Sequence, residues 1–448
     1  MTALVLFILP GIAILVLCRG RLEIGLLASI GLGQWLAGAD LTREIHPRLF
    51  GVCLAGTIAL VVGYALAGRQ KRNPHPGTER VRSKLASRSA LGWLSVATVA
   101  LVVIHFARGG VPLFSKDIET ARFQIASSGL LGLPSRAYLF GLPILILAYA
   151  SLKYRTSREA RIIWLLAATF VVSRLLGGLK SGLLEVTFVA LLAHIIHSGR
   201  APRLLSGPVA RRAAIGLVAV VFAGYLGTQY ASVQAGSIHG AADYLVGRMT
   251  VGTVSAGAYA VEDRGLNDAG PYLLKDFLYY TNRYAADAPR RTGLFTPPLY
   301  DESRLISTGL VGLPPATSGY VSPVAPGLAA SLFLDWGWGG VCVGMAIAGF
   351  LLRRLQWRAV GVLGLSAGIW GTAALVGVYV ISNGGLAYYT INFGAVAVLY
   401  VLGARVLRGA RLGADPMQAT LFAFQDTVVE GPSQYSVSAP VKARRDDD

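Results

Sequence analysis

The chain has 448 residues, of which 54% are hydrophobic and only 14% are charged, and its formal net charge is +18 at pH 7. Soluble domains carry about 25% charged residues, so this composition excludes a soluble globular protein and indicates an integral membrane protein. The mean hydropathy of +0.56 agrees with that class.

Eleven stretches are apolar enough to predict membrane-spanning helices, since a helix needs about 17 to 25 apolar residues to cross the hydrocarbon. They are 2–18, 24–39, 49–68, 91–107, 135–152, 161–178, 182–198, 213–230, 332–352, 359–381 and 386–404. The first stretch lacks a basic segment before it and a small-residue cleavage site after it, so we expect a retained helix. The sequence therefore predicts an all-α polytopic membrane protein.

The basic excess is concentrated in one set of the predicted loops. Lys and Arg crowd 19–23, 69–90, 153–160, 199–212, 353–358 and 405–448. Cytoplasmic loops of membrane proteins carry such an excess. We therefore expect the N-terminus outside and the C-terminus in the cytoplasm, and we interpret the positive charge as an orientation signal rather than as a nucleic-acid site.

With this orientation, two long loops lie on the outer face, over 108–134 and 231–331. Loops of such length are usually functional. Nothing in the composition divides the membrane region, which we expect to be one unit over 1–411. Residues 412–448 are expected to form a disordered polar tail in the cytoplasm.

The longer outer loop contains two stretches in which apolar residues recur at helical spacing, 241–263 and 271–284. Neither is long or apolar enough to span the membrane. We expect both to lie along its surface as amphipathic helices. The residues expected on the apolar side of the second are Leu273, Leu274, Phe277, Leu278 and Tyr280.

No nucleotide-binding motif occurs, so the candidate chemistry lies among the ionisable side chains of the outer face. Arginine binds phosphate oxygens in pairs and keeps its charge when desolvated, which favours a lipid-linked pyrophosphate as ligand. The predicted substrate-binding residues are Arg122, Arg136, Arg174, Lys180, Arg248 and Arg283. A carboxylate or histidine would accept the proton of an acceptor hydroxyl. The predicted catalytic residues are Asp117, His239 and Asp276.

Some of these residues have a second interpretation. Arg174 lies about one turn before its helix ends, so it either binds the ligand or snorkels to the interface. Glu185 is interpreted as the partner of Arg174 or Lys180 in a structural ion pair. His194 and His197 have no acids nearby, so no metal site is predicted, and no cofactor is expected.

Two segments resemble a known family. The first outer loop contains GGVPLFSKDIETARFQ (109–124), with Arg136 at the start of the next helix. The exit from the long loop, over 316–355, contains Trp336, Gly337 and Gly340 in an aromatic-Gly-x-x-Gly pattern. Together with the eleven apolar stretches, these segments resemble the O-antigen and exopolysaccharide repeat-unit polymerases of the Wzy type.

The resemblance implies a metal-independent membrane glycosyltransferase of the C-type architecture, with a periplasmic active site, in the bacterial inner membrane. It implies undecaprenyl-pyrophosphate-linked oligosaccharide as substrate, and membrane lipid and a chain-length regulator protein as partners. It supports Asp117 and Arg122, and more loosely Arg136, as site residues. An O-antigen ligase using His239, or a non-enzymatic transporter of lipid-linked oligosaccharide, remains the alternative.

The charge asymmetry generates a test of topology. Reporter fusions after Arg88 and after Asp268 are expected to report opposite compartments, with the first in the cytoplasm, because the basic loops stay on the cytoplasmic side. The activities of paired alkaline phosphatase and fluorescent protein fusions measure this. The same compartment at both positions would rule out the predicted orientation.

Overall fold

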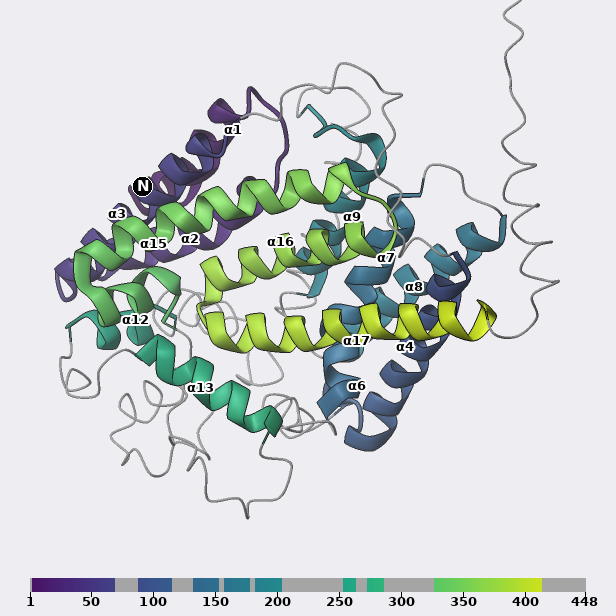
Figure 1. Cartoon of the computed structure of the whole chain (residues 1–448). Coiled ribbons are helices and arrows are strands. Elements are labelled where there is room, and N and C mark those ends of the chain that lie inside the picture. Colours follow the sequence, from purple (N-terminus) through teal and green to yellow (C-terminus); the bar gives the residue numbers. More distant parts are fainter. Residues whose placement is uncertain are drawn as a thin grey trace, which may run out of the picture.

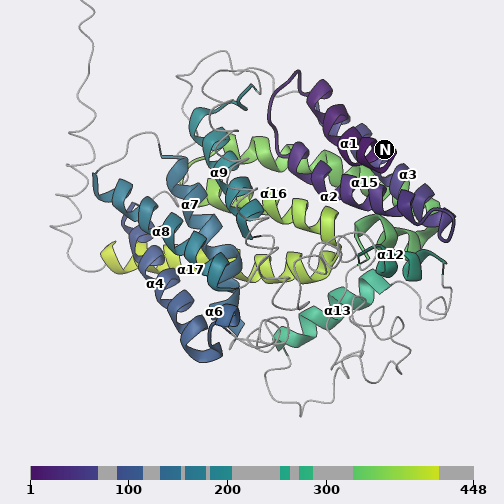
Figure 2. The ribbon, with the colours of Figure 1, turned by 180° about the vertical axis from the view of Figure 1, so that it is seen from behind.

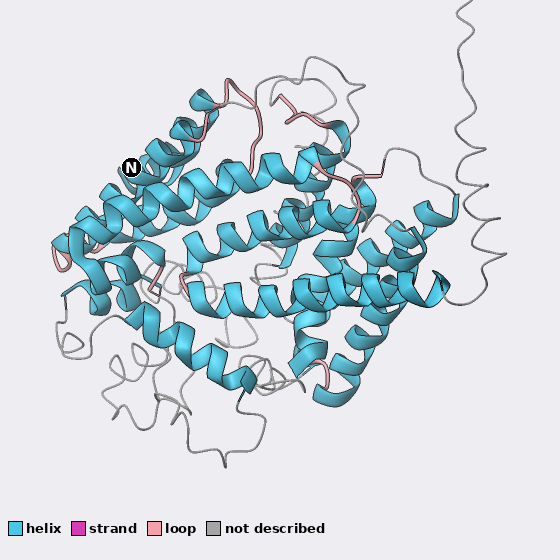
Figure 3. Cartoon of the chain, in the orientation of Figure 1, coloured by secondary structure: helices cyan, strands magenta, loops and turns pink. Residues whose placement is uncertain are grey.

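The computed structural model describes residues 2–68, 88–114, 132–152, 157–177, 182–203, 253–262, 272–285 and 326–412. Within these ranges the chain is helical and forms no sheet (Figure 3). Six helices of the described part are long and apolar enough to cross a membrane by length and composition. The predicted class, an all-α membrane protein, agrees with this architecture.

The helices follow the chain order of the predicted apolar stretches. They are α1 (Thr2–Leu17), α2 (Gly25–Leu41), α3 (Pro47–Leu66), α4 (Arg88–Gly109), η1 (Pro112–Phe114), α6 (Leu133–Arg136), η3 (Ala137–Gly141), α7 (Leu142–Ala150), α8 (Ser157–Leu176), α9 (Gly182–Ser198), α12 (Thr253–Glu262), α13 (Tyr272–Ala285), α15 (Leu328–Gly361), α16 (Leu365–Asn383) and α17 (Leu386–Leu412). The stretch 213–230 lies outside the described residues, and 359–381 covers the end of α15, residues 362–364 and most of α16. The other predicted stretches fall on helices.

The last three helices, α15, α16 and α17, run side by side across the molecule (Figure 1). On one side of them lie α1, α2 and α3, and on the other side lie α4, α6, α7, α8 and α9, as the view from behind also shows (Figure 2). The central helix, α16, contacts α2, α7 and α15. It therefore joins the two groups of helices into one packed bundle.

Small residues allow α3 and α15 to approach each other closely. A Cβ atom on Gly63 would clash with the carbonyl group of Ala346, and one on Gly349 would clash with that of Leu60. Between membrane helices, association depends on van der Waals packing, and glycine lets the backbones come near. The most extensive helix contact among the described elements is accordingly the one between α3 and α15.

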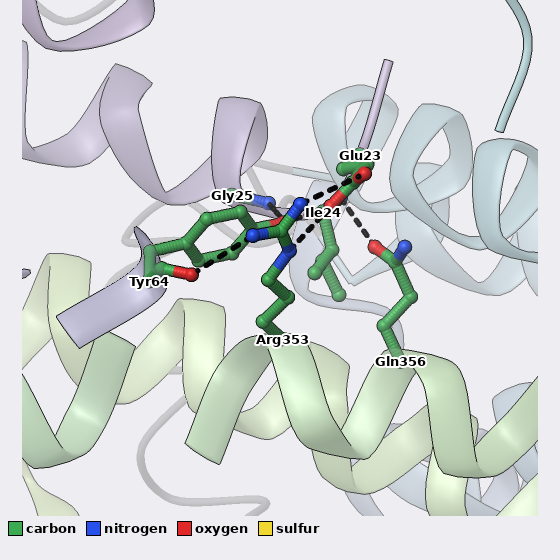
Figure 4. Close-up of polar contacts among 6 residues, drawn as sticks. All are labelled: Glu23, Ile24, Gly25, Tyr64, Arg353 and Gln356. Atoms are coloured by element: carbon green, nitrogen blue, oxygen red, sulfur yellow. Dashed lines mark hydrogen bonds and ion pairs between the residues drawn. The ribbon is translucent and has the colours of Figure 1, made fainter. Parts of the chain in front are cut away.

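A buried ion pair joins the start of α2 to the C-terminal half of α15 (Figure 4). Arg353 Nε lies 3.1 Å from Glu23 Oε2, and Nη2 donates to Glu23 Oε1 at 3.4 Å. Arg353 Nη1 donates to the carbonyl oxygen of Tyr64 at 3.1 Å, and the Tyr64 hydroxyl donates to Glu23 at 2.9 Å. Buried charges persist only where the protein compensates them, and here each charge meets its partner and further hydrogen bonds.

The same cluster satisfies the first N–H groups of α2, which have no partner within the helix. Ile24 N donates to Gln356 Oε1 at 2.7 Å, and Gly25 N donates to the Tyr64 hydroxyl at 3.2 Å (Figure 4). The N-cap residue of α2, Ile24, forms no capping hydrogen bond with its own side chain. The start of α2 is therefore fixed by side chains from α3 and α15.

The prediction that residues 353–358 form a loop is wrong, because they are helical. α15 continues to Gly361 and α16 begins at Leu365, so only residues 362–364 separate the two helices. The sequence places a helix end at the first arginines because charge is costly in a membrane. Arg353, however, lies inside the protein against Glu23 and is a packing residue rather than a boundary.

α15 is sharply broken near its start. Gly337 has φ +60° and ψ −150° inside the helix, a conformation that glycine adopts at little cost. The segment before the break folds back on the longer one, since the side chain of Leu332 reaches the position of Gly344. Asp335, just before the break, contacts the start of α13.

The buried ion pair generates a stability prediction. Arg353→Met is expected to lower the free energy of unfolding by about 3 to 5 kcal/mol, because Glu23 would remain as an uncompensated buried charge. Adding Glu23→Gln should restore part of that loss, since no buried charge then remains. Unfolding of the purified protein in detergent measures both variants. Equal destabilisation by the single and the double variant would show that the two charges do not depend on each other.

Candidate functional site

The described part of the chain includes the side chains of three predicted site residues, Arg136, Arg174 and Asp276. Arg283 lies in α13, but its side chain is outside that part. The other predicted residues lie outside the described residues: Asp117, Arg122, Lys180, His239 and Arg248. The three described residues lie on α6, α8 and α13.

The three residues lie on elements that meet α17 or the turn η3. Arg136 ends α6, which packs against α4 and α17, and Asp276 lies in α13, which packs along α17 (Figure 1). Arg174 lies in the last turn of α8 and contacts η3, the turn that follows Arg136. The structure thus connects Arg136 and Arg174 through η3, while Asp276 lies on a separate helix that also packs against α17.

Arg136 is held by an amide within the apolar helix α17. Its Nε donates to Asn392 Oδ1 at 2.7 Å, and Asn392 Nδ2 donates to the carbonyl oxygen of Tyr388 at 2.6 Å. Both side chains are buried. An amide inside an apolar membrane helix is costly unless it is hydrogen-bonded, so its presence marks a specific contact. Asn392 was not predicted, although a buried amide in an apolar stretch is a signal that sequence reasoning could have used.

An apolar cavity of about 310 Å³ opens beside Arg136, between α6 and α17. The residues that line it are Leu133, Arg136, Gly394, Ala395, Val396, Val398 and Leu399. Val398 and Leu399 are exposed on the outside of the bundle, where apolar side chains face lipid. The cavity is therefore a groove with a hydrocarbon wall and a single guanidinium group.

η3 is a π-helical turn between α6 and α7. It lies within the stretch 135–152, for which the sequence predicts an uninterrupted membrane helix. Such turns are rare and occur mostly as insertions in α-helices at functional sites. The Tyr138 ring stacks on His105 with centroids 5.0 Å apart, and Ser135 Oγ lies 3.1 Å from His105 Nδ1. The turn thus displays Arg136 and Tyr138 next to the end of α4.

Arg174 is almost fully buried, with 2% of its surface exposed. Its Nε lies 2.8 Å from Glu185 Oε2, and its Nη2 donates to the carbonyl oxygen of Leu139 at 3.2 Å. The guanidinium carbon lies 4.6 Å from the ring centre of Tyr138 and 4.8 Å from that of Phe170. The interpretation of Arg174 as a snorkelling side chain is wrong, and the predicted ion pair with Glu185 is confirmed.

α13 is a helix as predicted, but the side that it buries matches the expected one only in part: Tyr280 is buried, and Leu273 and Phe277 are half-buried. Tyr272, Asp276 and Tyr280, spaced four residues apart, are buried, whereas Leu274 and Leu278 are exposed. The Tyr280 ring packs against Tyr388 of α17, with centroids 5.5 Å apart. The helix therefore carries the predicted catalytic residue Asp276 into the protein, with a strip of leucine on the outside.

Two carboxylates accept hydrogen bonds from the starts of helices and so join α15 to α13 and α12 to α3. Asp335 accepts hydrogen bonds from Tyr272 N and Leu273 N, both at 2.8 Å, at the start of α13. Glu262, at the end of α12, accepts one from Arg48 N at 3.0 Å at the start of α3. Carboxylates stabilise helix N-termini through these bonds and the helix dipole. Asp335 was not predicted, although it is the one acid in the α15 sequence.

Comparison of the chain with protein-family models, curated proteins and solved structures gave no match. Among the described residues, no group of three or more His, Cys, Asp or Glu side chains lies close enough together to hold a metal ion. The described residues form an apolar groove with the guanidinium group of Arg136 in its lining, and Asp276 is buried on α13, which packs against the same helix α17.

The cap on α13 generates a prediction. Asp335→Ala should destabilise the docked helix by about 1 kcal/mol, because two N–H groups lose their acceptor. Amide exchange in 272–285 should then be roughly fivefold faster. Hydrogen–deuterium exchange with mass spectrometry measures this, and Glu44→Ala, which removes an exposed acid, is the control. Unchanged exchange across α13 would contradict the capping role of Asp335.

Proposed function

We propose that this protein is a membrane glycosyltransferase that polymerises lipid-pyrophosphate-linked oligosaccharide units on the outer face of the bacterial inner membrane. The observation that carries the proposal is the apolar groove along α17 that Arg136 helps to line. A polyprenyl pyrophosphate fits these two features, because its hydrocarbon chain suits the apolar groove and its adjoining pyrophosphate suits the guanidinium group.

Arg136 is suited to the pyrophosphate for two reasons. Guanidinium keeps its charge when it is desolvated, and its planar donors match phosphate oxygens. Its Nε is engaged by Asn392, so the orientation of the group is fixed before any ligand binds. A fixed donor binds an anion without a further entropic cost for ordering the side chain.

The groove is suited to the hydrocarbon chain. Small residues of α17, Gly394 and Ala395, leave the space, and Val398 and Leu399 extend its wall to the exposed surface of the bundle. A polyprenyl chain would enter from the bilayer with little loss of apolar contact, since both surroundings are hydrocarbon. The pyrophosphate would then be drawn to Arg136.

The reaction is transfer of the glycan from the lipid pyrophosphate to a hydroxyl of the acceptor sugar. The acceptor oxygen forms a bond to the anomeric carbon, the bond from that carbon to the pyrophosphate breaks, and the lipid pyrophosphate leaves. A carboxylate accepts the hydroxyl proton, and we assign this role to Asp276, which α13 carries into the bundle. The leaving group supplies the driving force, so no nucleotide sugar is required.

The sequence resemblance to Wzy-type polymerases supports the same proposal and extends it. It adds Asp117 and Arg122 to the site and implies a C-type glycosyltransferase architecture. The apolar stretches and the charge distribution add eleven crossings and a periplasmic N-terminus to the proposal. His239, Lys180, Arg248 and Arg283 belong to the same outer surface in this scheme. Undecaprenyl-pyrophosphate-linked repeat units are the substrate, and a chain-length regulator is a partner.

Substitution of Arg136 tests the proposal directly. Arg136→Ala should weaken use of the lipid-linked donor roughly ten- to a hundredfold, because one charge-assisted phosphate contact is lost. Arg405→Ala, which removes an exposed arginine at the other end of α17, is the control. The length distribution of the surface glycan in a complemented deletion strain measures the effect, and single repeat units are expected for Arg136→Ala. Normal chains in that variant would refute the proposal, and loss of all transfer to the lipid A core with polymerisation intact would favour the ligase.

The groove can be filled without disturbing the fold. A Cβ atom at Gly394 meets open space, so Gly394→Leu should fold normally while its side chain occupies the groove. Gly92, in α4, also has open space around it and lies away from the groove, so Gly92→Leu is the matched control. Glycan chains should shorten in the first variant only, at equal protein level and thermal stability. Full-length chains in Gly394→Leu would show that the groove does not hold the lipid.

A further inference from the structure

The turn η3 begins directly after Arg136, so the position of the Arg136 side chain depends on the geometry of that turn. A π-helical turn widens the backbone and disturbs the regular hydrogen bonds of an α-helix, so it needs support from its surroundings. The carbonyl oxygen of Leu139, within the turn, accepts a hydrogen bond from Arg174 Nη2 at 3.2 Å. A side chain from α8 therefore supports the backbone of η3.

Arg174 also supports the side chains of the turn. Its guanidinium group lies over the Tyr138 ring, and that ring stacks on His105, which contacts Ser135 just before Arg136. The residues on both sides of Arg136 are thus held through one connected set of contacts. Glu185 Oε2 lies 2.8 Å from Arg174 Nε and so holds the same guanidinium group.

Direct binding of a pyrophosphate by Arg174 does not fit these contacts. The side chain is 2% exposed, and its charge is compensated by a carboxylate. A pyrophosphate bound to Arg174 would lie beside the carboxylate of Glu185. Neighbouring negative charges repel each other strongly in a poorly solvated site. Arg136, by contrast, lines the open groove.

We propose that Arg174 is a positioning residue that holds η3 in its π-helical form and so orients Arg136 toward the groove. The proposal rests on the proposed function, in which Arg136 binds the donor pyrophosphate. It assigns Arg174 and Glu185 a shared role, in which Glu185 fixes Arg174, Arg174 fixes the turn, and the turn fixes Arg136.

The first experiment needs no ligand. Removing only one charge would leave the other buried alone and endanger the fold, so both are replaced together in the variant Arg174→Met/Glu185→Leu. Amide exchange over 133–142 should rise at least fivefold in this variant, while exchange in α3 and α15 stays unchanged. Hydrogen–deuterium exchange of the purified full-length chain measures it. Unchanged exchange over 133–142 would overturn the positioning role, whatever the function of Arg136.

The second experiment is a double-mutant cycle on binding of undecaprenyl pyrophosphate to the protein in nanodiscs. Arg136→Ala alone and the Arg174→Met/Glu185→Leu variant should each weaken binding roughly ten- to a hundredfold. If Arg174 acts only through Arg136, adding Arg174→Met/Glu185→Leu to Arg136→Ala should weaken binding no further than Arg136→Ala does. Losses that multiply would show that Arg174 binds the pyrophosphate itself and would overturn the inference.

The two experiments separate the inference from the function on which it rests. Faster exchange over 133–142, with unaltered binding in Arg136→Ala, would refute the donor-binding function of Arg136 while supporting the role of Arg174 in the turn. Arg174→Lys with Glu185 retained provides a rescue. It keeps the ion pair but lacks the planar donor geometry, so binding should lie between that of the wild type and that of the Arg174→Met/Glu185→Leu variant.

Discussion

Every charge that these apolar helices bury must find its partner inside the protein, because surrounding hydrocarbon supplies neither hydrogen bonds nor counter-ions. The pair between Arg353 and Glu23 obeys this constraint at one end of the bundle, and the pair between Arg174 and Glu185 obeys it where α8 and α9 meet η3. Each pair joins different helices. The helices can therefore pack in few other ways, since a shift of one helix would separate the charges.

The same constraint explains how an apolar bundle builds a polar site. Arg136 donates a hydrogen bond to the side-chain oxygen of Asn392 in α17. This bond satisfies the buried amide and also holds Arg136 beside the groove. Asp335 similarly has two backbone N–H groups of α13 as partners. Polar groups in this region are thus mutually dependent, which gives the site its fixed geometry and makes it sensitive to single substitutions.

The apolar elements contribute shape rather than chemistry. Glycines let α3 and α15 pack backbone to backbone, while Gly394 on α17 leaves space that no other described side chain fills. The break at Gly337 turns the first segment of α15 back over the bundle and brings Asp335 to α13. Glycine therefore has two different effects in this protein. Where another helix lies opposite, it allows close packing, and where none does, it leaves an open groove.

The sequence by itself determined the membrane class, the helical stretches and the existence of α13, because length, composition and periodicity are properties of about twenty neighbouring residues. It also indicated the ion pair of Glu185, whose partner Arg174 is near in the chain. It could not determine that Arg353 is buried, since its partner Glu23 is 330 positions away. It also could not determine which side of α13 faces inward, since the helix packs against Tyr388, which is remote in the chain. The contacts of Arg136, the π-helical turn and the groove likewise arose only in the tertiary structure, because each depends on helices that meet in space and are remote in the chain.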